Sequence, residues 1–163
     1  MRSTDLAVSA IVEHDGRFLI VEEYASGRRV FSQPGGHIES GESPEAAVVR
    51  ETLEETRCHV ACGDLVGVYL WVDPTTGRQY VRIVFIAEYL GCDDTLEFDD
   101  GIIARHWMTL AELESRRFSL RSPAVLQCMR DYVSGNCQPG TALAEMMPLQ
   151  RHVDQVLATA RVV

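Results

Sequence analysis

Residues 34–57 read PGGHIESGESPEAAVVRETLEETR, a glycine-rich loop that leads directly into an acidic segment. Ser43 followed by Pro44 predicts a helix start, because serine caps free amides of the first turn and proline fits the first helical position. We therefore expect a helix from about residue 44 to 56. At 3.6 residues per turn, its expected core-facing stripe is Ala46, Val49, Leu53 and Thr56.

Three carboxylates, Glu51, Glu54 and Glu55, are expected on the side of this helix away from that stripe. Like charges at this spacing destabilise a helix by a few tenths of a kcal/mol. A solvated face, neutralised in part by Arg50 and Arg57, is one interpretation. The other is a magnesium site, because Mg²⁺ prefers closely spaced hard oxygen ligands and the glycine loop can bring a backbone carbonyl beside them.

The spacing of these residues resembles the signature of the Nudix hydrolase family. That signature is Gly, five residues, Glu, seven residues, Arg-Glu, an aliphatic residue, any residue, Glu-Glu, any residue and Gly. The six fixed positions that match are Gly36, Glu42, Arg50, Glu51, Glu54 and Glu55. Two positions depart from it: Thr52 replaces an aliphatic residue, and Arg57 replaces the glycine, where a left-handed helix end would cost about 1 kcal/mol.

The resemblance implies a hydrolase that cleaves a phosphoanhydride bond with Mg²⁺, for which Mn²⁺ can substitute. The implied metal ligands are Glu51, Glu54, Glu55 and the carbonyl of Gly35. Either Glu51 or Glu54 would be the general base, with Arg50 orienting Glu51 and with Glu42 and Gly36 supporting the site. Three residues of an acidic loop could add a ligand or base, or form an ordinary solvated turn: Glu97, Asp99 and Asp100.

Segments outside the signature resemble the bacterial phosphatase-type branch of the family. They are residues 21–23, 32–34, 121–123 and 132–135. This branch implies release of inorganic phosphate from nucleoside tri- and diphosphates, thiamine pyrophosphate or its hydroxymethylpyrimidine pyrophosphate precursor. Two alternatives remain open: a nucleotide-sugar or dinucleotide pyrophosphatase, and a non-catalytic ligand-sensing module. Candidate substrate contacts, each also explicable as core or solvated surface, are His37, Trp71, Tyr69 and Arg82.

The rest of the pattern predicts one α/β (α+β) domain, and the resemblance implies a Nudix-type α/β/α sandwich with a mixed sheet. Strands are expected near residues 6–14, 17–24, 29–33, 60–72, 79–89 and 102–108. Thr109 and Ser122-Pro123 predict two further helices, to residue 115 and to about 133. We expect the hydrolase domain to span residues 1–140, followed by a partly helical extension over 141–163.

Composition limits the possible partners and location. The 163 residues carry a net charge of −9, which disfavours nucleic-acid binding. No apolar run approaches the roughly 20 residues that cross a bilayer, and the start is not a signal peptide, so we expect a cytoplasmic protein. The five cysteines form no CxxC pair, and we expect all of them to be reduced thiols. The expected partner is a small pyrophosphate substrate, and the chain could be a monomer or a homodimer.

Overall fold

The computed structural model describes residues 4–25 and 27–143. The predicted order of strands and helices is confirmed within these ranges. The strands are β1 (Thr4–Ile11), β2 (Glu13–His14), β3 (Arg17–Ala25), β4 (Arg28–Ser32), β5 (Cys58–Val72), β6 (Gln79–Cys92) and β7 (Ile102–Met108). The helices are α1 (Pro44–Thr56), α2 (Leu110–Ser115), α3 (Ala124–Val133) and the short 3₁₀ turns η1 (Arg117–Ser119) and η2 (Gly140–Ala142). The helical extension expected after residue 143 lies outside the described residues.

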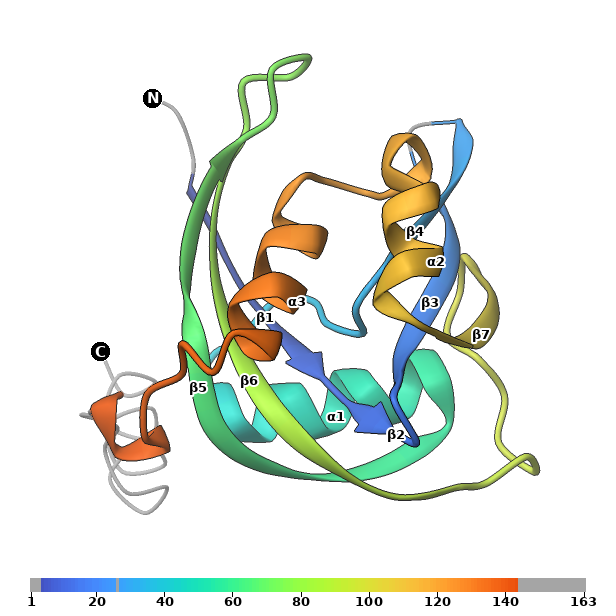
Figure 1. Cartoon of the computed structure of the whole chain (residues 1–163), viewed down its shortest axis with the longest axis vertical. Helices are drawn as coiled ribbons and strands as arrows, with labels where there is room; N and C mark the ends of the chain where they lie inside the picture. Colours follow the sequence, from blue (N-terminus) through green and yellow to red (C-terminus); the bar gives the residue numbers. More distant parts are fainter. Residues whose placement is uncertain (1–3, 26, 144–163) are drawn as a thin grey trace, which may run out of the picture.

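Two sheets form the framework. In the first, β6 lies between β1 and β5, parallel to β1 and antiparallel to β5, so this sheet is mixed as expected. In the second, β3 pairs antiparallel with β2, β4 and β7. The long β5–β6 hairpin curves around the molecule (Figure 1). None of the described helices has the length and apolar character needed to span a bilayer.

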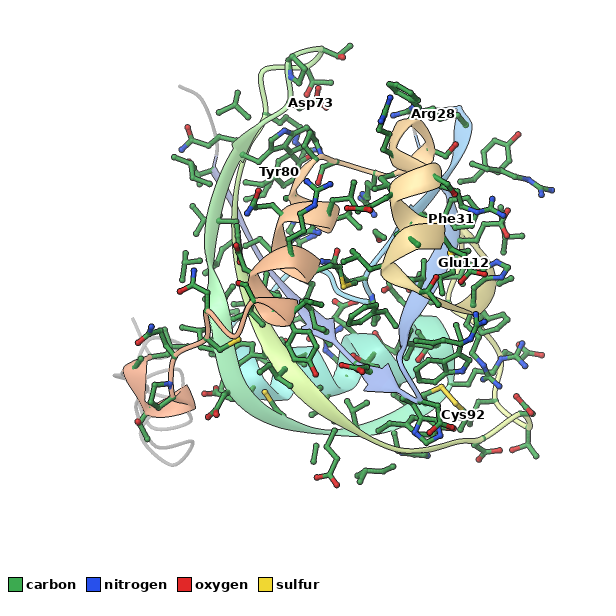
Figure 2. The ribbon with its side chains drawn as sticks, viewed as in Figure 1. Arg28, Phe31, Asp73, Tyr80, Cys92 and Glu112 are labelled. Atoms are coloured by element: carbon green, nitrogen blue, oxygen red, sulfur yellow. A yellow bond between two sulfur atoms is a disulfide. The ribbon has the colours of Figure 1, made fainter. Side chains whose placement is uncertain are left out.

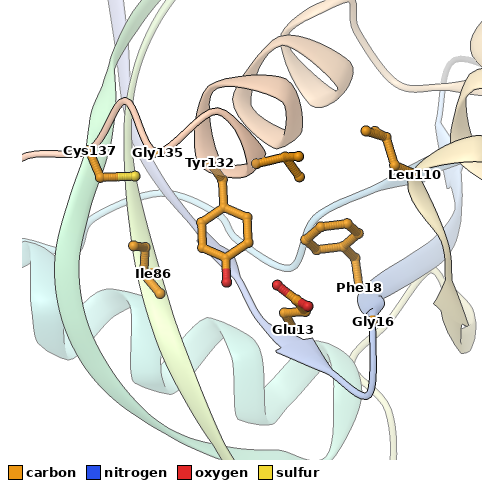
Figure 3. A pocket seen from close by; sticks show the side chains of 9 residues that line it. Glu13, Gly16, Phe18, Ile86, Leu110, Tyr132, Gly135 and Cys137 are labelled. Carbon is orange, nitrogen blue, oxygen red and sulfur yellow. The ribbon is translucent and has the colours of Figure 1, made fainter.

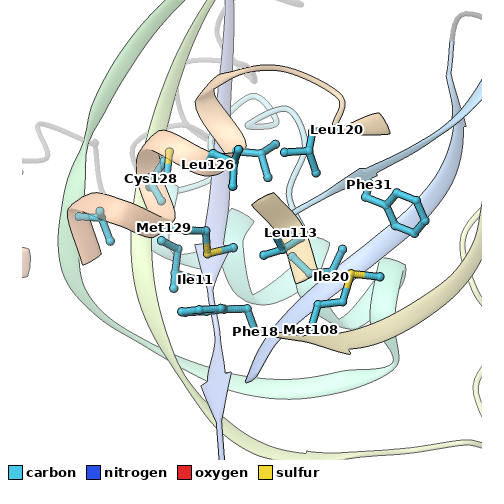
Figure 4. Close-up of a cluster of buried hydrophobic side chains, with 13 residues drawn as sticks. Ile11, Phe18, Ile20, Phe31, Met108, Leu113, Leu120, Leu126, Cys128 and Met129 are labelled. Atoms are coloured by element: carbon cyan, nitrogen blue, oxygen red, sulfur yellow. The ribbon is translucent and has the colours of Figure 1, made fainter. Parts of the chain in front are cut away.

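Helices cover both faces of this framework, with α1 on one side and α2 and α3 on the other (Figure 1). Alternate residues of β6 point to the two sides, as the period of two in a strand requires. Ile83 and Phe85 join Ala47 and Val48 of α1 in one buried cluster. Val84 joins Met129 and its neighbours from α2 and α3 in the other, shown in Figure 4. The predicted α/β/α layering is confirmed.

The bounds predicted for α1 are confirmed, but of the predicted buried stripe only Thr56 is buried. The Ser43 hydroxyl accepts a hydrogen bond from the Ala46 amide at 3.1 Å, as a helix cap does. The residues of α1 that are buried are Ala47, Val48, Thr52 and Thr56. The helix is thus turned by roughly one residue step, about 100°, from the expected orientation. Apolar residues occur on both sides of the helix, so hydrophobicity alone does not fix which side packs.

The end of α1 keeps the left-handed conformation that the family's glycine would allow, although Arg57 stands at that position. Arg57 adopts the left-handed conformation with φ 59°, where glycine is usual. Its guanidinium stacks on the ring of Phe98 at 3.6 Å from the ring centroid. Such a cation–π contact contributes about 0.5–1 kcal/mol, which offsets much of the backbone cost.

One expectation about the cysteines is wrong. Cys58 and Cys92 form a disulfide that joins the start of β5 to the end of β6; Cys92 is labelled in Figure 2. The two residues are direct partners in the antiparallel register of these strands, which places their sulfur atoms together. Cys62, Cys128 and Cys137 are free, as expected.

Candidate active site

The glycine loop runs beside β1 and is held there by its backbone. The Val8 amide donates to the Gly36 carbonyl and the Ala10 amide donates to the Pro34 carbonyl, both at 2.9 Å. A Cβ atom on Gly35 would collide with the Val8 carbonyl and with Ser9. Only glycine therefore allows this approach, and it sets the loop's position against α1.

Two carboxylates of α1 contact this loop directly. The Gly35 amide donates to Glu55 Oε2 at 2.8 Å. Glu51 packs against Gly36 so closely that a Cβ there would lie 2.5 Å from its carboxylate oxygens. These contacts explain why α1 turns Glu51 and Glu55 toward the loop and leaves Val49 exposed.

Arg50 joins the third carboxylate of α1 to the loop. Its Nη1 donates to Glu51 at 2.9 Å and to Glu54 at 3.0 Å. Its Nε and Nη2 donate to the two oxygens of Glu42 at 2.7 and 2.8 Å, and Nη2 also donates to the His37 carbonyl at 3.1 Å. Arg50 therefore contacts both Glu51, which we expect it to orient, and Glu42, which we expect to support the site.

Burial makes these carboxyl groups electrostatically unequal. Desolvation raises the pKa of Glu55 to about 8, against the opposing effect of the Gly35 amide. Desolvation also raises the pKa of Glu51, although Arg50 acts in the opposite direction. The hydrogen bond from Arg50 lowers the pKa of Glu42. Glu55 is therefore a partly buried, desolvated acid with no arginine within ion-pair distance among the described residues.

A cavity of about 290 Å³ opens where the loop, α1 and the inner face of β6 meet. It brings together some of the predicted site residues and three further charged or aromatic residues. The predicted residues that line it are Gly35, Gly36, His37, Glu51, Glu55 and Arg82. The additional charged and aromatic residues are Glu39, Tyr80 and Arg121.

The two predicted aromatic contacts lie behind this lining. Trp71 stacks on Tyr80 with ring centroids 5.6 Å apart, so it reaches the cavity only through that ring. Tyr69 packs on the buried cluster of α2 and α3, and its hydroxyl donates to Asp131 at 2.7 Å. Burial, and after it this hydrogen bond, raise the pKa of Tyr69. Tyr69 therefore supports the wall of the cavity and does not line it.

The expected metal ligands are only partly assembled. Among the described residues, no group of three or more Asp, Glu, His or Cys side chains is arranged to hold a metal ion. Glu54 faces Arg50, whereas Glu51 and Glu55 share the cavity. The acidic loop stays outside: Glu97, Asp99 and Asp100 are exposed, although the Asp99 amide donates to the Glu54 carbonyl at 3.0 Å.

The side chains that do share the cavity still fit a divalent cation. Glu55 is a desolvated carboxyl without a cationic partner, and a second carboxyl, Glu51, lies beside it. Within the described chain the Gly35 carbonyl accepts no backbone hydrogen bond, unlike the carbonyls of Pro34 and Gly36 on either side. Carboxylate and carbonyl oxygens are the donors that Mg²⁺ and Mn²⁺ take.

A larger cavity of about 570 Å³ lies elsewhere, between the β2–β3 turn and the end of α3 (Figure 3). Its lining is mainly apolar, with Phe18, Ile86 and Leu110 around the ring of Tyr132. Burial, followed by a hydrogen bond to Glu13, raises the pKa of Tyr132 to about 12. No carboxylate of α1 reaches this cavity, so it offers none of the chemistry described above.

Known proteins share this sequence and architecture. The chain matches the NUDIX domain over residues 3–127. It is 31% identical to Phosphatase NudJ of Escherichia coli (strain K12) over 134 residues, covering 82% of this chain and 86% of that protein.

Solved structures agree with this match. A NUDIX hydrolase from Nitrosomonas europaea superposes with a TM-score of 0.87 at 32% identity, covering 90% of this chain and all of that one (100%). A MutT NUDIX hydrolase from Burkholderia pseudomallei shares the fold, with a TM-score of 0.65 at 24% identity over 80% of this chain and 98% of that one. The glutamate-bearing helix, its glycine loop and these matches together show that the chain belongs to the Nudix hydrolase family, whose members cleave pyrophosphate bonds.

Proposed function

We propose that this hydrolase uses a divalent cation, Mg²⁺ or Mn²⁺, to release inorganic phosphate from nucleoside tri- and diphosphates or from compounds like thiamine pyrophosphate. The observation that carries the proposal is the pair of partly buried carboxyls, Glu51 and Glu55, beside the glycine loop. Similarity to a phosphatase over most of the chain supports phosphate as the product.

The proposed ligands are Glu51, Glu54, Glu55 and the Gly35 carbonyl. When bound, the cation supplies positive charge to phosphate oxygens and lowers the pKa of a water molecule. Among the described residues, Arg50 is the one partner of the Glu54 carboxylate, at 3.0 Å, and the proposal requires this side chain to turn toward the cavity. The Glu54 side chain is 45% exposed and so is free to change rotamer.

Glu51 is the proposed general base. Its carboxylate lines the cavity, and burial raises its pKa, which makes it a stronger proton acceptor. Arg50 fixes its orientation through the 2.9 Å contact to one carboxylate oxygen. Gly36 leaves room for this carboxylate, because any side chain there would displace it.

Aromatic rings near the cavity suit a flat organic group. Tyr80 lines the cavity, and Trp71 stacks behind it at an interplanar angle of 26°. A nucleobase or pyrimidine ring placed on Tyr80 would extend this stack, which favours such rings over sugars. His37, whose side chain is 64% exposed at the rim, is the proposed further contact.

A phosphate-release screen tests the proposal. Nucleoside tri- and diphosphates, thiamine pyrophosphate, nucleotide sugars and dinucleotides are incubated with Mg²⁺, with and without an added phosphatase. We expect free phosphate without the added phosphatase, no activity in EDTA, and loss of activity by at least about 10²-fold in Glu51→Gln. Glu88→Gln, an exposed change on β6, is the matched control and should retain activity.

Two outcomes would contradict the proposal and indicate a different function. Phosphate that appears only with added phosphatase would indicate cleavage of an inner anhydride, as in nucleotide-sugar or dinucleotide pyrophosphatases. Ligand binding without turnover, unchanged in Glu51→Gln, would indicate a ligand-sensing module.

A further inference from the structure

Two arginine side chains share the cavity with the carboxyls of α1. Arg82 projects from β6, and Arg121 lies just before α3. The charge of Arg121 is close enough to Glu55 to act against the rise in that residue's pKa. The cavity therefore has an acidic part and a basic part, contributed by segments that are far apart in the sequence.

Arg121 is held rigidly. Its Nη1 donates to both oxygens of Glu23 on β3, at 2.6 and 2.7 Å, and the side chain of Glu23 is only 12% exposed. The backbone amide of Arg121 donates to the Phe31 carbonyl at 2.9 Å, which fixes the start of this segment against β4. A guanidinium has five N–H donors, so the contact with Glu23 leaves Arg121 donors for a ligand.

Arg82 is a partly buried cation without a carboxylate partner. Within the described part of the chain it forms no ion pair and donates no side-chain hydrogen bond. Its cross-strand partner Tyr69 donates a hydrogen bond to Asp131 instead. Desolvation lowers the pKa of Arg82, and the charge of Arg121 lowers it further. Burying a cation beside a second cation costs stability. The chain has 24 acidic residues against 15 basic ones, yet none of the described acids pairs with this arginine.

The other arginines of this fold that are only partly exposed are paired or stacked, as Arg105 is with Asp94 and Arg57 is with the ring of Phe98. An unpaired arginine beside a second guanidinium that is held in place instead has the arrangement that binds phosphate oxygens. This position also supplies the positive charge that the acidic part of the same cavity lacks.

Building on the proposed function, we propose that Arg82 and Arg121 together bind one phosphate group of the substrate's diphosphate, while the adjoining phosphate lies toward Glu51 and Glu55. Glu23 acts as a positioning residue, because it holds the Arg121 fork in place. Arg82 is kept for binding and not for stability.

Binding of methylenediphosphonate, an analogue of diphosphate whose P–C–P bridge cannot be hydrolysed, tests this assignment. Calorimetric titrations are made in EDTA and again in Mg²⁺, and the unfolding of each unliganded variant in urea is measured alongside. In Arg82→Gln we expect affinity to fall about 10- to 100-fold, while the unliganded protein is as stable as wild type or more stable. Arg130→Gln removes an exposed arginine far from the cavity and is the matched control.

Arg121→Lys provides a second test. Lysine can keep the ion pair with Glu23, but its single ammonium group lacks the separate nitrogens with which a guanidinium contacts a carboxylate and a phosphate together. We expect weaker binding with little loss of stability. Affinity within about twofold of wild type in Arg82→Gln would overturn the proposal, as would a loss of binding matched by a loss of unliganded stability. Titration in EDTA requires no turnover, so the result is independent of whether phosphate release is found.

Discussion

Glu55→Gln tests the electrostatics of the site most directly. The side-chain oxygen of glutamine can still accept the hydrogen bond from the Gly35 amide, but glutamine cannot ionise. The substitution therefore removes the titratable group and little else. In the folded protein desolvation raises the pKa of Glu55 from 4.5 to about 8. The folded state therefore retains a proton that the unfolded chain loses, and wild-type stability should fall as pH rises between those two values.

The size of the effect follows from the same pKa. A rise from 4.5 to about 8 corresponds to about 5 kcal/mol of lost stability at pH values above both, at about 1.4 kcal/mol per pH unit. The two proteins should differ by less than about 1 kcal/mol near pH 5, and Glu55→Gln should be the more stable by about 4 kcal/mol near pH 8.

Urea unfolding in EDTA across this pH range measures the difference. Added Mg²⁺ should then stabilise wild type near pH 8 and leave Glu55→Gln almost unchanged, because the cation binds the ionised carboxylate. Glu88→Gln, exposed on β6, should show the wild-type pH profile. Equal stability of wild type and Glu55→Gln near pH 8 would refute the reasoning that this carboxyl is desolvated and unpaired.

Three further substitutions test single contacts. Arg50→Lys should cost about 2 kcal/mol in urea unfolding, because one ammonium cannot bridge Glu42 and Glu51 together; full stability would show that the fork geometry is unimportant. Arg57→Ala should be less stable than Arg57→Gly by about 1 kcal/mol, because alanine keeps the strain at φ 59° and both lose the ring contact. Gly36→Ala should reduce phosphate release more than about 10²-fold while the melting temperature changes little, because its Cβ would displace the Glu51 carboxylate; wild-type turnover would contradict the close packing seen here.

Local signals predicted the helices well. Ser43 and Pro44 set the start of α1, and Thr109 starts α2 through a reciprocal cap with Glu112. Such signals lie within a few residues of the feature that they specify. The orientation of α1 was missed because its buried face is chosen by tertiary contacts with the glycine loop, and Ala47 and Val48 are no more apolar than Ala46 and Val49.

The composition of the cavity was only partly predictable for a related reason. The family signature identifies Glu51 and Glu55, because they belong to one continuous motif. Arg121 reaches the site only because β1, β6 and the segment before α3 meet, and the parallel pairing of β1 with β6 has no local sequence signal. Tyr80, Arg82 and Val84 are every second residue of β6 and so share one face of the strand. The change from polar to apolar along this face was the available indication that its first part lines a site and its later part lies in the core.

The disulfide was missed for the same kind of reason. Cys58 and Cys92 are far apart in sequence and become neighbours only through the register of β5 and β6. Counting and spacing of cysteines cannot reveal such a pair.

The many contacts of Arg50 have a mechanical consequence. The guanidinium of Arg50 donates two hydrogen bonds to Glu42 and one each to Glu51, Glu54 and the His37 carbonyl. When Glu54 changes rotamer, Arg50 therefore loses one hydrogen bond and keeps the others. A metal ion would then bind and dissociate with one rotamer change, that of Glu54, while the backbone of α1 and the glycine loop stays in place. NMR relaxation of the α1 backbone should accordingly be alike with and without Mg²⁺.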